Sequence, residues 1–543
     1  MVLPVALIDV LGFGVLLSSV LAVSVLVRRG LTGIGRCSVL SVVTGLAAVV
    51  TLLLKAGAVL QFAIPDSAEY VGMASRLLHD DTFFLRLDGR DLPSRYQPWF
   101  SWFLLYPLMK LSHTTWILAF LPPLCAILGA YAAAMLAVAI LPPDRRSLAP
   151  TIGAGVVLVP AYLYFSGHLI TDIPATAITL LLAAVYCAGP AHAIPLVRLG
   201  CVGVLGALVF SMRPLGILAL LPFLVESRRG VGRLAVLLVP TAIVAAASLW
   251  LNQEIFGDPF RSGYNLWVAV PYDYLGRTFS LEYVSANLEV LVKDPVFLAF
   301  SVVGLFPLST KTRDRLRLDT HESRVLVFVG LALVPQMIVH LVYFYSTIRF
   351  FLALEVVCGI LVACRVASIV PKRVFAIGAL CLVLVVGLVK SPAAISSMRH
   401  SALERIGKLR GCAPVNALVV SARHSVLNEE FVVRASDRTL VPVSRHTELA
   451  SKVLVWSRVE APHGVDIDPR DHRASWLLQA GVEEVYPHVA VERPELLSDA
   501  IANGITVVLD REGISTEDLQ ALERNFSIEP FCAEFEKLSV RLE

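Results

Sequence analysis

The chain has 543 residues, of which 56% are hydrophobic and only 16% are charged. Soluble domains usually carry about 25% charged residues, so the composition excludes a large soluble core and favours a membrane protein. The formal net charge is +3, and the arginines lie mostly at the ends of apolar runs. A nucleic-acid-binding protein would instead gather them in a basic stripe, so that class is excluded as well.

The first apolar run extends from Val2 to Val27 and is followed directly by Arg28 and Arg29. A cleaved signal peptide has its positive charges before the apolar segment, not after it. We therefore expect this run to be a retained membrane anchor whose N-terminus lies outside.

Further apolar runs follow along the chain, and most of them approach the roughly 20 residues that a membrane-spanning helix needs. With the first run they predict a polytopic α-helical membrane protein of roughly twelve spans, two of them short. The further runs cover residues 38–62, 116–141, 148–167, 172–189, 196–211, 214–226, 233–251, 294–309, 323–345, 350–368 and 373–391.

Lysine and arginine cluster in the short connections between these runs, which is typical of cytoplasmic loops. Counting spans between the clusters places all of them on one side. The loops at about 63–115 and 252–294, the turns at 167–172 and 212–213, and the segment from about 392 onward should then face outward. The clusters are Arg28, Arg29 and Arg36; Arg145 and Arg146; Arg198; Arg228, Arg229 and Arg233; Lys311, Arg313, Arg315 and Arg317; and Arg365, Lys372 and Arg373.

The last part of the chain differs in character, because short apolar runs alternate there with amphipathic helical patterns such as Thr516–Asn525. This alternation predicts a small soluble α/β domain with a parallel sheet. We expect residues 1–391 to form the transmembrane domain and 392–543 to form the external soluble domain of a multi-pass protein in the plasma or inner membrane. Cys412 and Cys532 could form a disulfide there, or they could be two unrelated buried thiols.

Three carboxylates stand where predicted spans reach the outer face, at Asp66, Glu69 and Asp172. Ionisable groups at membrane depth are costly and usually functional. Asp66 and Glu69 are about one helical turn apart and could face one cavity, or they could only cap a helix. Asp172, with His168 nearby, could likewise be catalytic or only a cap.

Two arginines, Arg213 and Arg349, interrupt apolar sequence at the same predicted face. Guanidinium groups bind phosphate through two parallel hydrogen bonds, so both suit a lipid phosphate. They could also be anchors that reach toward the membrane surface. Lys55 and Glu355 are further charges within apolar runs, and we expect them to neutralise each other rather than to have a direct role.

The order of these features resembles the GT-C class of membrane glycosyltransferases, which includes lipid A aminoarabinose transferases and protein O-mannosyltransferases. The resemblance covers about residues 38–391. The chain departs from many relatives at Gln97-Pro98-Trp99, lacks a proline in 352–355, and has the run at 2–27 as an extra span. The motifs are Pro65-Asp66-Ser67-Ala68-Glu69-Tyr70, Tyr96-x-Pro98, Gly167-His168-x-x-Thr171-Asp172-x-Pro174, Arg213-Pro214-x-Gly216, Phe256-Gly257-Asp258-Pro259-Phe260-x-x-Gly263-Tyr264 and Arg349-Phe350-Phe351.

The resemblance implies that a hexose or pentose passes, with inversion, from a polyprenyl-phosphate carrier to a lipid, glycan or protein acceptor at the outer face. Asp66 would be the general base, and Glu69 and Asp172 would position the acceptor or the sugar. Some members of the class use a divalent metal, but the sequence has no clear ligand set and implies no certain cofactor. The residues implied in substrate binding are Tyr96, His168, Arg213, Tyr264 and Arg349.

Two other classes of function stay open. A transporter or flippase of a lipid-linked or polar solute would also carry charges within its spans, although the sequence has no repeated half and no pair of matching broken helices. A non-catalytic scaffold could instead use the external domain to bind a partner.

Overall fold

The computed structural model describes residues 5–33, 38–59, 65–80, 85–87, 90–92, 97–112, 115–228, 230–262, 278–305, 321–344, 346–397, 402–414, 416–421, 439–442, 490–491, 494–511, 514, 516–532 and 535–541. These residues form two units. The first draws on Met1–Val59, Trp99–Arg261 and Gly276–Ser396, and the second on Leu60–Pro98, Ser262–Leu275 and Ser397–Glu543.

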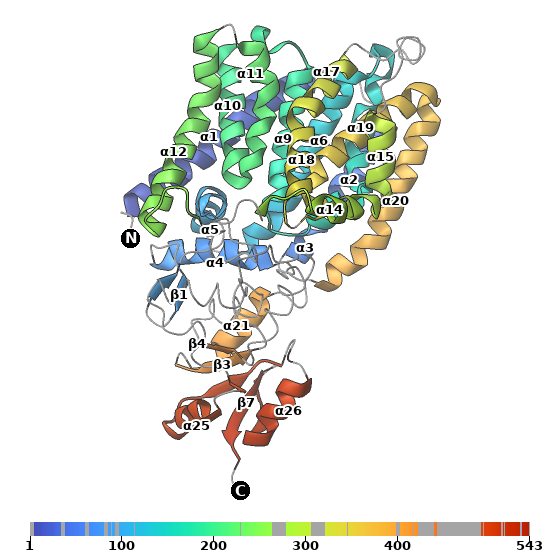
Figure 1. Ribbon diagram of the computed structural model, residues 1–543. Coiled ribbons are helices and arrows are strands. Elements are labelled where there is room, and N and C mark those ends of the chain that lie inside the picture. The colour runs from blue at the N-terminus through green and yellow to red at the C-terminus, as the bar shows by residue number, and fades with distance from the viewer. Residues whose placement is uncertain are drawn as a thin grey trace. The chain divides into compact units, whose positions relative to one another are not determined.

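The described part of the first unit is built from helices (Figure 1). In chain order they are α1 (Val5–Gly33), α2 (Val39–Leu53), α3 (Ala56–Val59), the π-helix η1 (Ser101–Leu105), α5 (Tyr106–Ser112), η2 (Thr115–Phe120), α6 (Leu121–Ile140), η3 (Pro143–Leu148), α7 (Ala149–Ala154), η4 (Gly155–Leu158), α8 (Pro160–Phe165), α9 (Asp172–Cys187), η5 (Ala191–Ala193), α10 (Leu196–Met212), η6 (Pro214–Leu220), α11 (Leu221–Ser227), α12 (Val231–Phe256), α14 (Tyr283–Val292), α15 (Pro295–Leu305), α17 (His321–Phe328), the π-helix η8 (Val329–Leu333), α18 (Val334–Val342), η9 (Ile348–Phe351), α19 (Leu352–Ile369) and α20 (Lys372–Ser397).

The described helices confirm that the chain is a polytopic α-helical membrane protein. Seven stretches are long and apolar enough to cross a membrane, and shorter apolar helices of 10–17 residues accompany them. The total of about twelve spans stays a prediction. The seven stretches are Ile8–Arg28, Val39–Val59, Ile117–Ile140, Val231–Glu254, Glu322–Val342, Ile348–Ile369 and Lys372–Val389.

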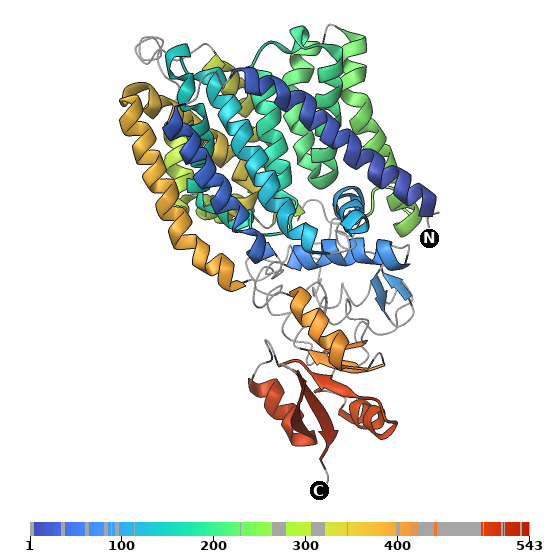
Figure 2. The ribbon, with the colours of Figure 1, turned by 180° about the vertical axis from the view of Figure 1, so that it is seen from behind.

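The centre of the first unit is α9, in which every residue except Val185 is buried. It contacts α6, α10, α17 and α19, and a helix that is apolar on all sides is expected in such a position. By contrast, α12 and α20 leave large apolar side chains such as Ile243 and Leu388 exposed, as lipid-facing helices do. Figure 2 shows α1 crossing obliquely over the bundle, where it packs on α10.

One predicted span is not a continuous helix. The run 148–167 is divided into α7, η4 and α8, with Val159 in an extended conformation at φ −80° and ψ 109° before Pro160. The break has a local cause, because proline disfavours the helical conformation of the residue before it and has no N–H to donate. A second local stop is Gly257, which ends α12 in the left-handed conformation at φ 70°, where glycine is favoured.

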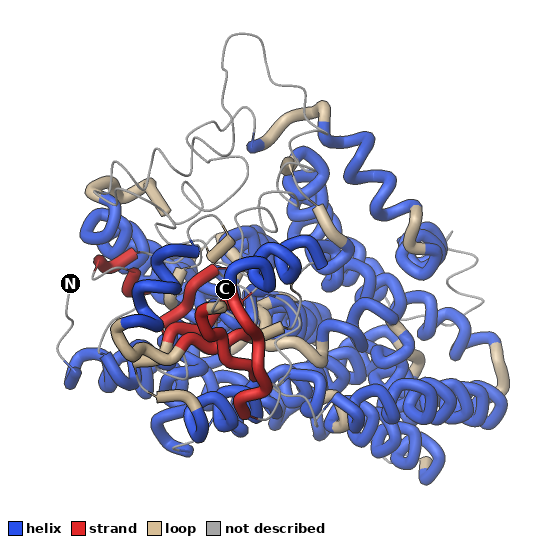
Figure 3. Tube along the Cα trace, turned by 90° about the horizontal axis from the view of Figure 1, so that it is seen from below, coloured by secondary structure: helices blue, strands red, loops and turns tan. Residues whose placement is uncertain are grey.

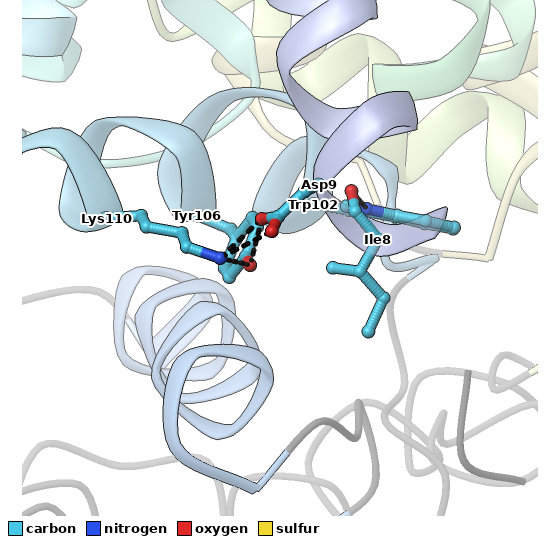
Figure 4. Close-up of polar contacts among 5 residues, drawn as sticks. All are labelled: Ile8, Asp9, Trp102, Tyr106 and Lys110. Carbon is cyan, nitrogen blue, oxygen red and sulfur yellow. Dashed lines mark hydrogen bonds and ion pairs between the residues drawn. The ribbon is translucent and has the colours of Figure 1, made fainter. Parts of the chain in front are cut away.

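A polar cluster joins α1 to α5, as Figure 4 shows. The Lys110 ammonium donates to Asp9 Oδ1 and Oδ2 at 2.5 and 2.7 Å, and the Tyr106 hydroxyl donates to Asp9 Oδ1 at 2.7 Å. Alongside, the Trp102 indole N–H donates to the Ile8 carbonyl at 3.0 Å. Asp9 lies within an apolar helix, and these contacts compensate its charge.

The second unit contains the described strands, drawn in red in Figure 3. Its elements are α4 (Pro65–Asp80), β1 (Leu85–Leu87), β2 (Arg90–Leu92), α21 (Ala402–Cys412), β3 (Leu418–Ser421), β4 (Thr439–Pro442), α25 (Pro494–Ala502), β5 (Val507–Leu509), α26 (Thr516–Asn525), β6 (Phe526–Cys532) and β7 (Phe535–Val540). The C-terminal α/β fold is therefore confirmed, while the domain boundary at 391/392 stays a prediction.

The five-stranded sheet has the order β4-β3-β5-β7-β6. Strands β4, β3 and β5 are parallel, but β7 is antiparallel to both β5 and β6. The expectation of a parallel sheet is thus wrong for the last two strands. Only two residues separate β6 from β7, and a connection that short can join only antiparallel strands.

One face of the sheet packs against α25 and α26 through Leu497, Leu509, Leu522 and Phe526. A disulfide joins Cys412 at the end of α21 to Cys532 at the end of β6, with the Cα atoms 6.2 Å apart. The structure thus decides the question that the sequence left open, in favour of the bridge.

Candidate functional site

The first component of the candidate site is an ion pair between Asp172 and Arg213, which are 41 residues apart in sequence. Asp172 is the first residue of α9 and is 2% exposed. Arg213 lies in extended conformation where α10 ends and η6 begins. The Asp172 carboxylate therefore binds a guanidinium across two elements, so it does more than cap its own helix.

The second component is the ring of Phe350, around which two cations and a histidine gather. The Arg213 guanidinium lies 5.1 Å from the ring centroid and that of Arg349 lies 5.4 Å from it. The His340 ring stacks on Phe350 at 4.6 Å with an interplanar angle of 19°. Cations are attracted to the face of an aromatic ring, so Phe350 helps to hold both guanidinium groups. The predicted arginines Arg213 and Arg349 are therefore brought together.

The third component is His168, in the connection before α9. It is 7% exposed, and its Nδ1 lies 2.9 Å from the Tyr164 carbonyl oxygen. Burial, together with the charges of Lys55 and Arg349, lowers the pKa of His168 to about 4. The imidazole is therefore neutral at neutral pH, and it lies within the electrostatic reach of two cations.

Several polar atoms at this site are buried without a hydrogen-bond partner among the described residues. They are Nε of Arg213 and the hydroxyl oxygens of Ser346 and Thr347. Ser346 and Thr347 directly precede the segment that carries Arg349 and Phe350. Buried polar groups are normally paired, so this cluster has unused capacity to donate hydrogen bonds to a ligand.

Cations outnumber carboxylates among the four charged residues named so far. Lys55, Arg213 and Arg349 contribute three positive charges and Asp172 contributes one negative charge, which leaves +2 for these four residues. The predicted neutralisation of Lys55 by Glu355 is wrong. Lys55 lies beside Gly167 and His168, whereas the Glu355 carboxylate has no hydrogen-bond partner among the described residues. Such a site suits an anion.

The predicted residues Asp66 and Glu69 belong to the second unit. The helix α4 begins at Pro65, so Asp66 lies in its first turn and is partly buried. Proline is common at this first position, and negative charge in the first turn is stabilised by the helix dipole. A capping residue directly precedes the helix, whereas Asp66 lies inside it. Asp66 therefore does not hold the capping position. Glu69 follows three residues later in α4, and Tyr96 and Tyr264 lie outside the described residues.

His340 was not among the predicted site residues, and Lys55 was not assigned to the site. His340 lies within the apolar run 323–345, and an ionisable residue inside a span is by itself a signal of function. Lys55 is also an ionisable residue inside a span. Its neighbours Gly167 and His168, however, lie more than a hundred residues further along the chain, so the sequence could not place it at the site. As for a metal, the described residues contain no group of three or more His, Cys, Asp or Glu that could hold one.

The sequence matches no protein-family model and no curated protein. The fold, however, is similar to that of ArnT from Cupriavidus metallidurans. The crystal structure of ArnT bound to undecaprenyl phosphate aligns with a TM-score of 0.56 at 13% identity, covering 92% of this chain and 97% of that chain. For ArnT in the apo state the TM-score is 0.54 at 13% identity, and the coverage is 90% and 95%. The chain therefore has the fold of ArnT, an aminoarabinose transferase of the GT-C class, which is the fold that the sequence motifs predicted.

Proposed function

We propose that the protein is a glycosyltransferase that moves a sugar from a polyprenyl-phosphate carrier to an acceptor at the outer face of the membrane. The observation that carries this proposal is the cationic site, in which Arg213 and Arg349 lie over Phe350 and Lys55 and Arg349 act on His168. The fold supports it, because ArnT has this fold and one of its structures contains undecaprenyl phosphate.

The charge of the site fits the charge change in such a reaction. The donor is a phosphodiester with one negative charge, and the departing polyprenyl phosphate carries up to two. Groups that bind charge developing in the transition state accelerate the reaction. Arg213 and Arg349 would hold the phosphate, and the buried Arg213 Nε would supply one of the hydrogen bonds. Asp172 would act through Arg213, by fixing the orientation of its guanidinium.

In the proposed step, an acceptor hydroxyl attacks the anomeric carbon from the side opposite the phosphate. The new carbon–oxygen bond to the acceptor forms while the bond from the anomeric carbon to the phosphate oxygen breaks. The electron pair of that bond leaves with the polyprenyl phosphate, and the acceptor proton passes to Asp66. The anomeric configuration inverts in this single displacement. Glu69 would position the acceptor, and Tyr96, Tyr264 and His168 would contribute to the substrate pocket.

The test uses the full chain in proteoliposomes with a polyprenyl-phosphate sugar whose sugar is radiolabelled, and with envelope lipids, glycans and proteins as acceptors. We expect label to appear in an acceptor with release of polyprenyl phosphate. Arg213→Ala and Arg349→Ala should lower the donor affinity. Lys293→Ala is the matched control, because Lys293 is an exposed cation directly after α14 that pairs with Glu289, and exposed pairs contribute little.

The same experiment separates the rival functions. Movement of the donor across the bilayer without transfer of label would support a transporter or flippase. Neither transfer nor movement, with several sugars and all acceptor fractions, would support a scaffold. In either case the proposed transferase would be wrong.

A further inference from the structure

A second set of buried polar groups lies between α15 and α19, where the two helices pack closely. A Cβ atom at Gly304 of α15 would lie 2.8 Å from the Cys358 carbonyl oxygen of α19 and 3.1 Å from its Cα. Real Cβ contacts are not that short, so only glycine permits this approach. We call the facing residues Asp294, Ser301, Glu355 and Cys358 the α15–α19 seam.

The seam contains a carboxylate in an unusual state. Glu355 is 0% exposed, and neither of its carboxylate oxygens has a hydrogen-bond partner in the described part of the chain. The hydroxyl oxygen of Ser301 is also buried, and its polar neighbour is the Cys358 thiol. Ser301 and Glu355 are neighbours of the same thiol, that of Cys358. The two unpaired oxygen atoms of Glu355 and the Ser301 hydroxyl therefore lie in one seam.

A second carboxylate contributes to the field at Glu355. Asp294 is the charged group whose electrostatic effect reaches Glu355, and its Oδ1 accepts the N–H groups of Val296 and Phe297 at 3.0 and 2.9 Å. Like charges repel, so a neighbouring carboxylate adds to the cost of a buried negative charge. The seam thus has an excess of negative charge.

Nearby cations do not compensate this charge, because they are engaged elsewhere. Arg365 of α19 donates to Glu322 at 2.7 and 2.9 Å, Arg145 of η3 donates to the Ala367 and Val370 carbonyls, and Arg349 of η9 lies over Phe350. The remaining titratable groups on described elements that pack against α19 supply no cation to Glu355; they are Asp144, Arg146, Cys125, Tyr131, Tyr162, Tyr164, Asp172, Tyr186 and Cys187. An isolated buried carboxylate costs several kcal/mol, and proteins avoid this cost by binding a compensating charge.

We propose that the α15–α19 seam binds one monovalent cation, H⁺ or Na⁺, through the Glu355 carboxylate with Ser301 and Asp294 beside it. A bound cation explains why Glu355 is stable without a partner in an apolar seam, where intramembrane carboxylates usually mark a cation site. A divalent metal fits less well, because no described group of three His, Cys, Asp or Glu could hold one. The proposal does not depend on sugar transfer.

The first test measures the thermal unfolding of the purified full chain at several pH values, with Na⁺ or with choline as the cation. A ligand that binds only the folded state raises Tm. If the ligand is Na⁺, Tm rises with Na⁺ concentration. If the ligand is H⁺, the folded state holds a proton that the unfolded chain releases, so Tm falls as pH rises. Glu355→Gln mimics the neutralised group, and we expect it to keep Tm and abolish this dependence.

The matched control is Glu289→Gln, which makes the same change at an exposed position on α14 and should keep the wild-type dependence. A second, site-specific measurement is labelling with a hydrophobic carbodiimide, which reacts with protonated carboxyl groups in apolar surroundings. The adduct should form at Glu355, located by mass spectrometry, and should decrease with rising pH or, for a sodium site, with added Na⁺. The proposal is overturned if the Tm difference between wild type and Glu355→Gln is unchanged by pH and by Na⁺.

Discussion

The two charges of the Arg213–Asp172 pair are unequal in exposure, since the Asp172 side chain is 2% exposed and that of Arg213 is 23% exposed. Removal of the arginine would leave a buried carboxylate without its guanidinium, which is more costly than the loss of the pair as a whole. This asymmetry makes Asp172 a sensitive reporter of the role of Arg213.

We therefore predict that Arg213→Ala destabilises the protein by about 3 kcal/mol and weakens donor binding. The double variant Arg213→Ala with Asp172→Asn should recover most of the stability but not the donor affinity. Thermal unfolding and binding of a polyprenyl-phosphate sugar would separate the two effects. A double variant that binds donor like the wild type would reduce Arg213 to a structural residue.

Asp66 carries the second prediction at this scale. Asp66→Asn preserves the size of the side chain but removes proton acceptance, so transfer should fall by about 10²–10⁴-fold. Folding and donor binding should stay at the wild-type level, as measured by thermal unfolding and by carrier binding. Normal turnover in this variant would make Asp172 the leading candidate for the base.

Part of the candidate site could be predicted from the sequence, residue by residue. The charges at Asp172, Arg213 and Arg349 could be singled out, because each interrupts apolar sequence. Their arrangement could not, because the Arg213–Asp172 pair joins residues 41 positions apart, and Lys55 reaches His168 rather than Glu355. Periodicity and spacing describe one element at a time, whereas these contacts depend on how elements far apart in the sequence pack together.

At the scale of elements, the contact between α1 and α5 is a testable link. Lys110 and Tyr106 on α5 together satisfy Asp9 on α1, and hydrogen bonding to Asp9 raises the pKa of Lys110. The ammonium group therefore stays charged at physiological pH. The extra N-terminal span would then hold the segment 99–112 in place.

We predict that Lys110→Met, which keeps the length of the side chain but not its charge, increases hydrogen exchange of the amides in residues 101–112. Adding Asp9→Asn should restore part of the protection, because the partly buried side chain at position 9 is then neutral. Lys372→Met offers a control at an exposed lysine on α20. Equal exchange in the wild type and in Lys110→Met would show that packing alone holds α5.

The elements themselves were largely predictable. Described helices cover the apolar runs to within a few residues, as for α9 against 172–189 and α10 against 196–211. The prediction of one continuous helix over 148–167 was wrong, because hydropathy does not report the effect of Pro160 on the backbone. The prediction of parallel pairing was wrong for β6 and β7. The alternation of strands and helices stops after α26, where β6 follows at once and pairs with β7.

For the molecule as a whole, orientation is the main prediction. A reporter fused after Glu543 and a tag near Gly263 should both be accessible from outside the cell. A tag near Arg315 should be accessible only from the cytoplasm, because the basic clusters all count to one side. Cysteine labelling with a membrane-impermeant reagent provides the measurement. A cytoplasmic C-terminus would reverse the topology and place the proposed chemistry on the wrong face.

The sheet of the second unit has a consequence for the order of events during synthesis. Strand β7 is the last of the five in sequence, yet it lies between β5 and β6. Proteins fold in part while the ribosome still extends them, N-terminal domains first. Here β5 has no partner on one side until residues 535–540 have emerged from the ribosome. The disulfide of Cys412 likewise cannot form before Cys532 has been synthesised. The soluble fold must therefore be completed after every described membrane-spanning helix has been synthesised, so a nascent chain stalled before β7 would present an open sheet edge to the quality-control machinery.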